Sequence, residues 1–489
     1  MTSRMQTLIV LGVFMLMYVF VAGMGRLTLV VPLIFIPLVL FLLARRDLLF
    51  MMLCFLYFST LRIPMMEGQL ELYHAAVSLY IVAALGAGAV RRRSISMNVP
   101  VFFAICFGLV VIYTMKFRGT GFRLLGSGLW GGGRYVEILL GLSIFLVSDS
   151  IRLSLRRWKT ALVGMVAAGA LPALAEVLYV YTKGATGFLY YVLQPIGVIG
   201  TAMQQMESGR MVRFTLMLQV SHIYMIPFFL RKVGRRLRLR NFFFPLLAMV
   251  LGGFSGHRMV LLNVTLYIWV YLFLLSKRRV AYLLVSAVLA SSSIFVLGQV
   301  AFIFPSAIQR MLSIIPFSNA SADIIAEAGG TVTWRILLWK DTIAEIPKYL
   351  WLGKGFAYSI ELESARDVRM WANAALWWAK VQTAYHQGIL SLLVGLGLPG
   401  LLAGSAFLLS LCRRHYRIWR DQRLDPAFAP LHYAVLVLLL VETVVYFIIY
   451  GDVFVSFPYL CLVGAMAEGI YRSGRLENTG VINAADADI

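Results

Sequence analysis

Three short patterns in the second half of the chain place an arginine or a histidine among glycines and aromatic residues. The first is Gly256-His257-Arg258, the second runs from Arg335 to Trp339, and the third begins at His386-Gln387. A guanidinium stays charged and presents fixed, paired donors to anionic oxygens, whereas an imidazole accepts a proton near neutral pH. These patterns therefore offer two kinds of chemistry, the binding of an anion and the transfer of a proton.

Each pattern also has a purely structural interpretation. Arg258 could extend from the end of an apolar run toward water, and Arg335 could belong to the polar face of an amphipathic helix. His386 could be a hydrogen-bonded residue at a membrane surface. Gly353 and Gly355 predict a tight turn, but no strand precedes them, so they do not indicate a nucleotide site.

The elements that must position these residues are hydrophobic helices. Of the 489 residues, 61% are hydrophobic and only 13% are charged, which leaves too little polar surface for a soluble protein of this length. Runs of about 20 apolar residues are long enough to cross a bilayer as helices. We therefore expect an all-α polytopic membrane protein with about fourteen transmembrane helices, at residues 5–24, 27–44, 48–63, 72–90, 98–115, 135–151, 160–181, 211–230, 242–256, 258–275, 280–304, 384–411, 430–450 and 453–470.

The basic residues predict the orientation of these helices. The chain carries a net charge of +22, and its Lys and Arg clusters, such as Arg91-Arg92-Arg93, fall on alternate segments between the spans. Cytoplasmic segments are enriched in Lys and Arg, so both termini, including the tail 471–489, should be cytoplasmic. This explanation of the charge leaves no need for a nucleic-acid partner.

One segment between spans is exceptionally long. Residues 305–383 separate the eleven spans of residues 1–304 from the three spans of residues 384–470, and this length indicates a functional or disordered segment. Two apolar stripes in this segment have the spacing of an amphipathic helix. The first is formed by Val332, Ile336, Trp339, Ile343 and Ile346, and the second by Val368, Trp371, Ala375 and Trp378. We expect a partly helical outer loop that lies on membrane lipids as a lid, with Arg258, Arg335 and His386 on the same face.

The order of the patterns resembles the O-antigen ligase and O-antigen polymerase family of bacterial membrane glycosyltransferases. The resemblance covers Arg210 to Gly400 and rests on a small-residue-plus-Arg step, an R-x-x-x-W pattern, a P…G-x-G-F turn and a His-led return to the membrane. Two details depart from the family. His257 precedes Arg258 where a serine is usual, and Gln387 follows His386 where an asparagine is usual.

The resemblance implies a function and a set of site residues. Family members take a glycan from an undecaprenyl-diphosphate carrier at the periplasmic face of the inner membrane and join it, with inversion, to a lipid-A core or a growing polysaccharide. No metal or cofactor is implied. By this resemblance His386 is the general base, with His257 and Gln387 as possible accessory residues. Arg258, Arg335 and, on a weaker match, Arg210 bind the diphosphate.

A rival interpretation is a transporter, such as a lipid-linked glycan flippase. It is favoured by ionisable residues inside the expected spans, namely His74, Glu137, Glu176, His222 and Glu442. Hydrogen bonding between helices accounts for most of these residues equally well. Transporters of this size usually show paired halves, whereas this chain has one long loop after the eleventh span. The choice between ligase and polymerase stays open.

Overall fold

The computed structural model describes most of the chain from Arg45 to Arg475. The described residues are 45–59, 72–90, 97–121, 129–187, 193, 214, 216–230, 243–275, 279–359, 379–380 and 383–475. The first two expected spans, Arg210, the stripe 368–378 and the tail beyond residue 475 lie outside these ranges.

The first part of the described chain forms five helices that agree with expected spans to within a few residues. They are α3 (Arg46–Ser59), α4 (Leu72–Val90), α5 (Val99–Arg118), α6 (Gly132–Leu146) and α7 (Leu155–Tyr181). N-terminal capping explains where α5 and α7 begin. The side chain of Asn98 accepts a hydrogen bond from the Val101 N–H, and Ser154 does the same for Arg157.

The middle of the chain differs from expectation at one point. Its helices are α10 (Met217–Ile223), α11 (Met225–Leu230), α12 (Phe243–Gly253), α13 (Met259–Leu275) and α14 (Arg279–Gln299), with the short η4 (Ala301–Ile303) after them. The single helix expected at 211–230 is interrupted at Tyr224. Pro227 explains the break, because it lacks an N–H for the carbonyl of Ile223 and its ring crowds that carbonyl.

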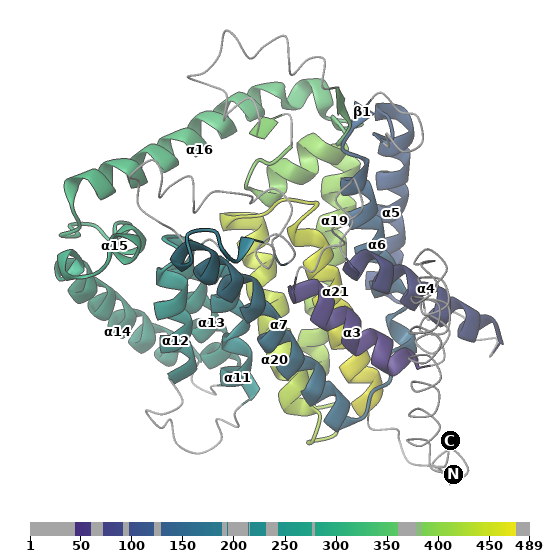
Figure 1. The fold of residues 1–489 in the computed structure, drawn as a ribbon. Coiled ribbons are helices and arrows are strands. Elements are labelled where there is room, and N and C mark those ends of the chain that lie inside the picture. The colour runs from purple at the N-terminus through teal and green to yellow at the C-terminus, as the bar shows by residue number, and fades with distance from the viewer. Residues whose placement is uncertain are drawn as a thin grey trace, which may run out of the picture.

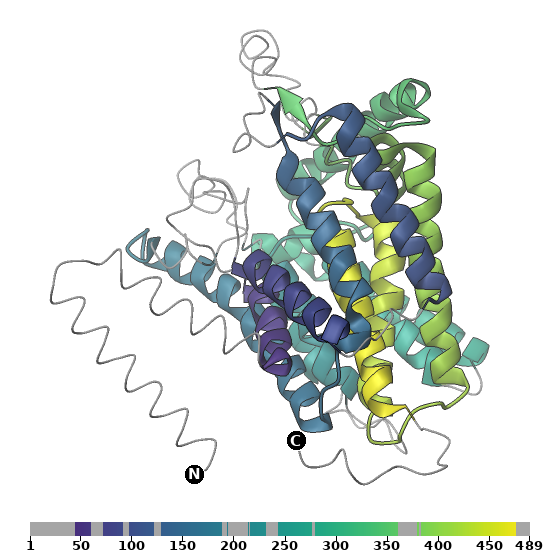
Figure 2. The same ribbon diagram turned by 90° about the vertical axis from the view of Figure 1, so that its right-hand side faces the viewer.

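The last helices form the upright bundle visible in Figure 2. They are α19 (Gly388–Arg420), α20 (Ala429–Val444), the π-helical turn η5 (Val445–Ile449) and α21 (Ser456–Gly474). Among the described residues, α5, α7, α19 and the continuous α20 to η5 segment are long and apolar enough to cross a membrane. The chain is therefore a membrane protein, and the total of fourteen spans stays a prediction.

The segment expected as a lid is partly helical where it is described. α15 (Ser306–Leu312) leads into α16 (Ala322–Tyr349), which crosses the upper end of the molecule from α15 toward β1 (Figure 1). The described residues confirm the expected helical fold, and the strands among them form one two-residue ladder. β1 (Leu129–Trp130) pairs antiparallel with β2 (Tyr358–Ser359), because the chain after α16 returns alongside the segment before α6.

The ionisable residues inside the helices are partnered. His74 and Tyr73 both bond to Glu137, and the His222 Nδ1 lies 3.1 Å from a Glu442 oxygen that also accepts from Tyr267. Glu176 accepts a hydrogen bond from the Leu216 N–H. These contacts join helices that are distant in sequence, as the hydrogen-bonding interpretation expects.

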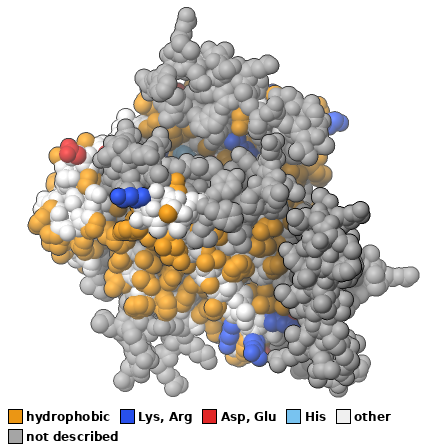
Figure 3. Space-filling model, viewed as in Figure 1, with side chains coloured by type: hydrophobic (Ala, Val, Ile, Leu, Met, Phe, Trp, Pro, Cys, Tyr) orange, Lys and Arg blue, Asp and Glu red, His pale blue; other side chains and the backbone are white. Residues whose placement is uncertain are grey.

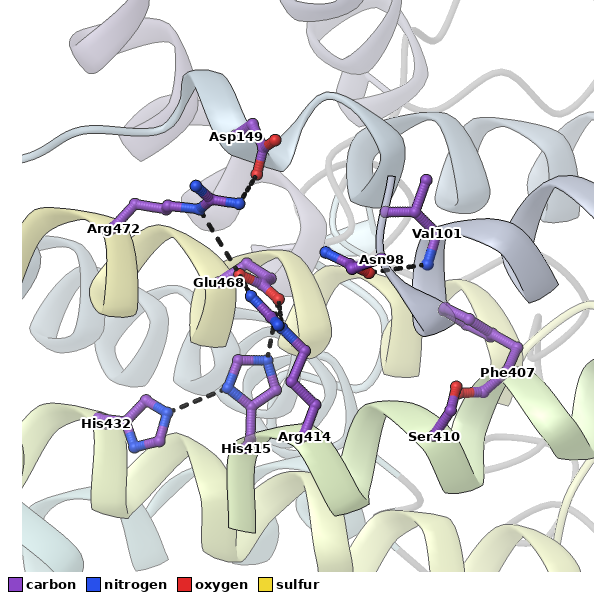
Figure 4. Close-up of polar contacts among 10 residues, drawn as sticks. All are labelled: Asn98, Val101, Asp149, Phe407, Ser410, Arg414, His415, His432, Glu468 and Arg472. Carbon is purple, nitrogen blue, oxygen red and sulfur yellow. Dashed lines mark hydrogen bonds and ion pairs between the residues drawn. The ribbon is translucent and has the colours of Figure 1, made fainter. Parts of the chain in front are cut away.

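A second polar network ties α19, α20 and α21 together at the end opposite α16 (Figure 4). Glu468 binds Arg414 and lies near His415, whose Nδ1 is 3.0 Å from the His432 Nε2. Arg472, one turn beyond Glu468, forms an ion pair of 2.9 Å with Asp149. Buried charges are stable only when they are paired, so this network fixes the register of the three helices.

Hydrophobic side chains cover the middle of the face drawn in Figure 3, while Lys and Arg side chains gather toward its lower edge. Exposed apolar residues of α12 and α13 include Leu246, Val250, Leu262 and Leu275. Such a continuous apolar surface suits lipid rather than water.

Candidate active site

The His386 imidazole lies beneath α16, at the residue pair that opens α19. Its backbone is strained, with φ of +53°, and its N–H donates a 3.0 Å hydrogen bond to Oδ1 of Asp452. The ring Nδ1 is 3.2 Å from Oδ2 of the same carboxylate. Positive φ at a residue other than glycine costs about 1–3 kcal/mol and is concentrated at functional sites.

Two aromatic rings hold the imidazole. Tyr450 stacks on it at 5.0 Å between centroids with an interplanar angle of 16°, and Trp334 approaches at 5.9 Å. Trp334 belongs to α16 and Tyr450 follows η5, so three segments that are far apart in sequence meet at this histidine. The ring is therefore restricted in its rotation.

Arg335 follows Trp334 and lies over the same tyrosine. Its guanidinium carbon is 5.6 Å from the Tyr450 ring centroid. The Arg335 Nε and the Trp334 Nε1 are buried and have no hydrogen-bond partner among the described residues. A buried donor without a partner costs about 1–3 kcal/mol, which is a reason to look for a substrate acceptor there.

Arg258 approaches Arg335 from the turn between α12 and α13. Its Nη2 donates a 2.7 Å hydrogen bond to the carbonyl of Ala328 on α16. Burial and, next, the charge of Arg335 lower the pKa of Arg258. Two guanidinium groups that repel one another favour an anion between them, because the anion stabilises both charges.

Arg310 on α15 stabilises the turn between α12 and α13 that carries Arg258. It is 5% exposed, and it donates 2.8 Å and 3.0 Å hydrogen bonds to the Gly256 carbonyl and the Thr331 hydroxyl. Gly256 has φ of +65°, which suits a residue without a Cβ. Arg310 thus ties this turn to α16, a role that the sequence did not reveal.

The structure brings Arg258, Arg335 and His386 into one region, while the side chains of the two accessory candidates, which adjoin them in sequence, are engaged in local hydrogen bonds. The His257 Nδ1 donates to the Ser255 carbonyl at 2.9 Å, within its own turn. Gln387 caps α19, since its side chain accepts from the Leu390 N–H at 2.6 Å and donates to the Phe447 carbonyl.

The glycine turn after α16 has a structural role. α19 is broken at Gly397, and Pro399 has no N–H for the carbonyl of Gly395, which instead accepts a 2.9 Å bond from the Gly355 N–H. The Lys354 N–H similarly donates to Val394 at 2.6 Å. Burial lowers the pKa of Lys354, whose Nζ donates to the Lys380 carbonyl. This turn therefore docks the loop onto the break in α19.

Sequence reasoning missed two charged residues of this region. Asp452 is 4% exposed and contacts His386, and the charge of Arg134 acts on Asp452 from the first turn of α6. The Arg134 guanidinium lies 4.6 Å from the Phe454 ring centroid. A signal was available for Asp452, because it is an isolated acidic residue between the last two apolar runs.

A comparison with known families matches the part of the chain that carries these residues. The family model for O-antigen ligase matches residues 241–405, a range that contains Arg258, Arg335 and His386 and ends before Asp452. No curated protein matches the chain. The family implies glycosyltransferase activity of the O-antigen ligase type, in a bacterial membrane, with lipid-linked glycan and polysaccharide or lipid-A substrates. Over residues 241–405 this membrane protein is therefore similar to the O-antigen ligase family, as the order of its patterns indicates.

Proposed function

We propose that this protein is an inverting, metal-independent glycosyltransferase of the bacterial inner membrane. It transfers a glycan from an undecaprenyl-diphosphate carrier to a hydroxyl of a lipid-A core or of a growing polysaccharide, at the periplasmic face. The observation that carries the proposal is the grouping of two mutually repelling arginines, Arg258 and Arg335, beside the aromatic-bound imidazole of His386.

The arginines suit the leaving group. When the bond between the anomeric carbon and the diphosphate oxygen breaks, its electron pair stays on that oxygen and the charge of the diphosphate grows. A guanidinium binds phosphate oxygens through two parallel N–H donors. Arg258 and Arg335 would therefore stabilise the transition state more than the ground state, which is the requirement for faster turnover.

His386 suits the attacking group. The acceptor hydroxyl loses its proton to the imidazole as its oxygen forms the new bond to the anomeric carbon, on the face opposite the diphosphate. The imidazolium then returns its proton to water, and the products are the inverted glycoside and the free carrier diphosphate. Arg210, which lies outside the described residues, remains a further candidate for the diphosphate.

The transporter alternative has lost its main support. His74, His222, Glu137, Glu176 and Glu442 each have a partner on another helix or segment. Paired groups of this kind hold helices together and need no transported substrate to explain them.

Purified protein in detergent tests the proposal directly. It is mixed with a synthetic undecaprenyl-diphosphate-linked glycan and with either lipid-A core or a second lipid-linked glycan, and the products are identified by mass spectrometry. A joined product that is absent with the His386→Ala variant supports the glycosyltransferase, and the productive acceptor separates ligase from polymerase. Movement of the donor across vesicles without any joined product would favour the flippase.

A further inference from the structure

The carboxylate of Asp452 is the buried acidic group nearest to His386 among the described residues, and it is held in a fixed position. Besides the His386 N–H, its Oδ1 accepts a 3.2 Å hydrogen bond from the Ser391 hydroxyl. Its backbone carbonyl accepts from the N–H groups of Val455 and Ser456, at 3.2 Å and 2.8 Å. These bonds place Asp452 at the N-terminal end of α21, where the helix dipole favours a negative charge.

Most of the other charged side chains near the imidazole are positive, and a further acid, Glu345, acts on the adjacent Tyr385 but pairs with Lys380. Arg335 lies on the α16 side, with Arg258 behind it, and Arg134 acts on Asp452 from α6. The remaining titratable neighbours are Tyr450, which stacks on the ring, and Tyr385, whose buried hydroxyl has no hydrogen-bond partner among the described residues. Asp452 is thus the acidic group that offsets these cations next to His386.

The geometry points to Asp452 as the positioning residue for His386, an inference that rests on the proposed glycosyl transfer. The Asp452 carboxylate accepts a hydrogen bond from the N–H at Nδ1 of the imidazole, and this selects the tautomer in which Nε2 is free to accept the proton of the acceptor hydroxyl. Nδ1 and Oδ2 are 3.2 Å apart, but their approach lacks hydrogen-bond alignment. Catalytic hydrogen bonds commonly tighten when substrate binds.

The local structure favours the contact between His386 and Asp452. The positive φ of His386 turns its side chain and its N–H toward the same carboxylate, while Tyr450 and Trp334 limit rotation of the ring. The strain at His386 is maintained by bonds on both of its sides, from Asp452 and from the Gln387 cap. A carboxylate behind a histidine holds the imidazole orientation and stabilises the imidazolium formed during the reaction.

The sign of the pH effect follows from charge. Removal of the negative charge of Asp452 disfavours the imidazolium form of His386, so a variant without that charge should keep its activity to lower pH. Asp452→Asn should therefore move the acid limb of the kcat/KM profile to lower pH by about one unit. The same variant should be about 10²- to 10⁴-fold slower at its optimum, because the amide also accommodates the wrong tautomer.

Two matched variants isolate the effect of the charge. Ser391→Ala removes one hydrogen bond from Asp452 but keeps the carboxylate, so the acid limb should stay in place while the rate falls by about five-fold. Glu442→Gln makes the same chemical change in the His222–Glu442 contact among the transmembrane helices, and it should leave the acid limb unchanged. The position of the limb does not depend on how much of each variant is folded.

A second measurement needs no turnover. Diethyl pyrocarbonate modifies the unprotonated imidazole, and mass spectrometry of the His386 peptide gives the extent of modification at each pH. The midpoint should move to lower pH in Asp452→Asn and not in Glu442→Gln. An unchanged midpoint and acid limb in Asp452→Asn would overturn the inference while leaving the glycosyl transfer intact. Full activity in His386→Ala would instead remove the base on which both proposals depend.

Discussion

The indole of Trp339 donates a 2.8 Å hydrogen bond to the backbone carbonyl of Tyr385, the residue directly before His386. Arg335 and Trp339 are four residues apart on α16 and so lie on one side of that helix. The R-x-x-x-W pattern therefore has a geometric meaning. The tryptophan attaches α16 to the chain at His386, and this attachment sets where Arg335 lies relative to the imidazole.

Arg258→Lys and Arg335→Lys should both be severely impaired although the charge is kept. An ammonium cannot reproduce a bidentate phosphate contact, and the loss of one such interaction with the leaving group should cost about 2–4 kcal/mol in barrier, or roughly thirty-fold to nearly a thousand-fold in rate. The turnover rate of each purified variant, compared with that of the wild type, measures this loss of rate. Arg423→Lys is the control, because Arg423 pairs with Asp421 in the exposed link between α19 and α20. Near wild-type turnover in either test variant would show that its arginine does not bind the diphosphate.

His386→Ala should lose activity by about 10²- to 10⁴-fold, the usual effect of removing a general base. His257→Ala should lose far less, because its Nδ1 is bound to the Ser255 carbonyl within its own turn. Both variants should still bind the lipid-linked donor, which a binding assay in detergent verifies. The opposite ranking in variants of equal stability would move the base to His257.

Activity should survive EDTA. The charge of the leaving group is balanced by guanidinium groups in the proposed mechanism, and in the described ranges no three His, Cys, Asp or Glu side chains come together as metal ligands would. The measurement is the initial rate after chelation and desalting, followed by addition of single divalent ions. Inactivation that one ion reverses would indicate a different mechanism.

Gly353→Ala should unfold more readily and lose activity. Gly353 has φ of +75°, and a Cβ there would lie 2.4 Å from the Gly395 carbonyl oxygen, so the turn could not dock onto α19. We expect a destabilisation of about 1–3 kcal/mol, seen as a lower apparent Tm in detergent. Gly329→Ala, on α16 with open space around it, should instead be neutral or stabilising by roughly 0.5–1 kcal/mol. Equal Tm values for the two variants would contradict the docking role.

The side of the membrane can be tested by cysteine labelling. Ser321 is exposed at the start of α16, and Gln422 is exposed between α19 and α20. An impermeant maleimide should label Ser321→Cys in cells with a permeabilised outer membrane and should label Gln422→Cys only after lysis, because the basic clusters place the second site in the cytoplasm. The reverse pattern would invert the topology and move the site to the cytoplasmic face.

Several features of this protein follow from local sequence. The helices α4, α5, α12 and α13 lie within a few residues of the expected spans, because each apolar run has to satisfy its backbone hydrogen bonds internally as a helix. The resemblance to the O-antigen ligase family was likewise confirmed over residues 241–405, because its patterns are short and keep their order.

Only the tertiary structure decided which of the candidate site residues contact one another. The contact between Asp452 and His386 spans 66 residues, and the bond from Trp339 to Tyr385 spans 46. Neither is encoded in a spacing along one helix, because each depends on how α16 and the segment before α21 pack against the start of α19. The imidazole lies between a carboxylate and two arginines because packing of helices distant in sequence brings their ends together, and a periodic pattern specifies only the face that each helix buries.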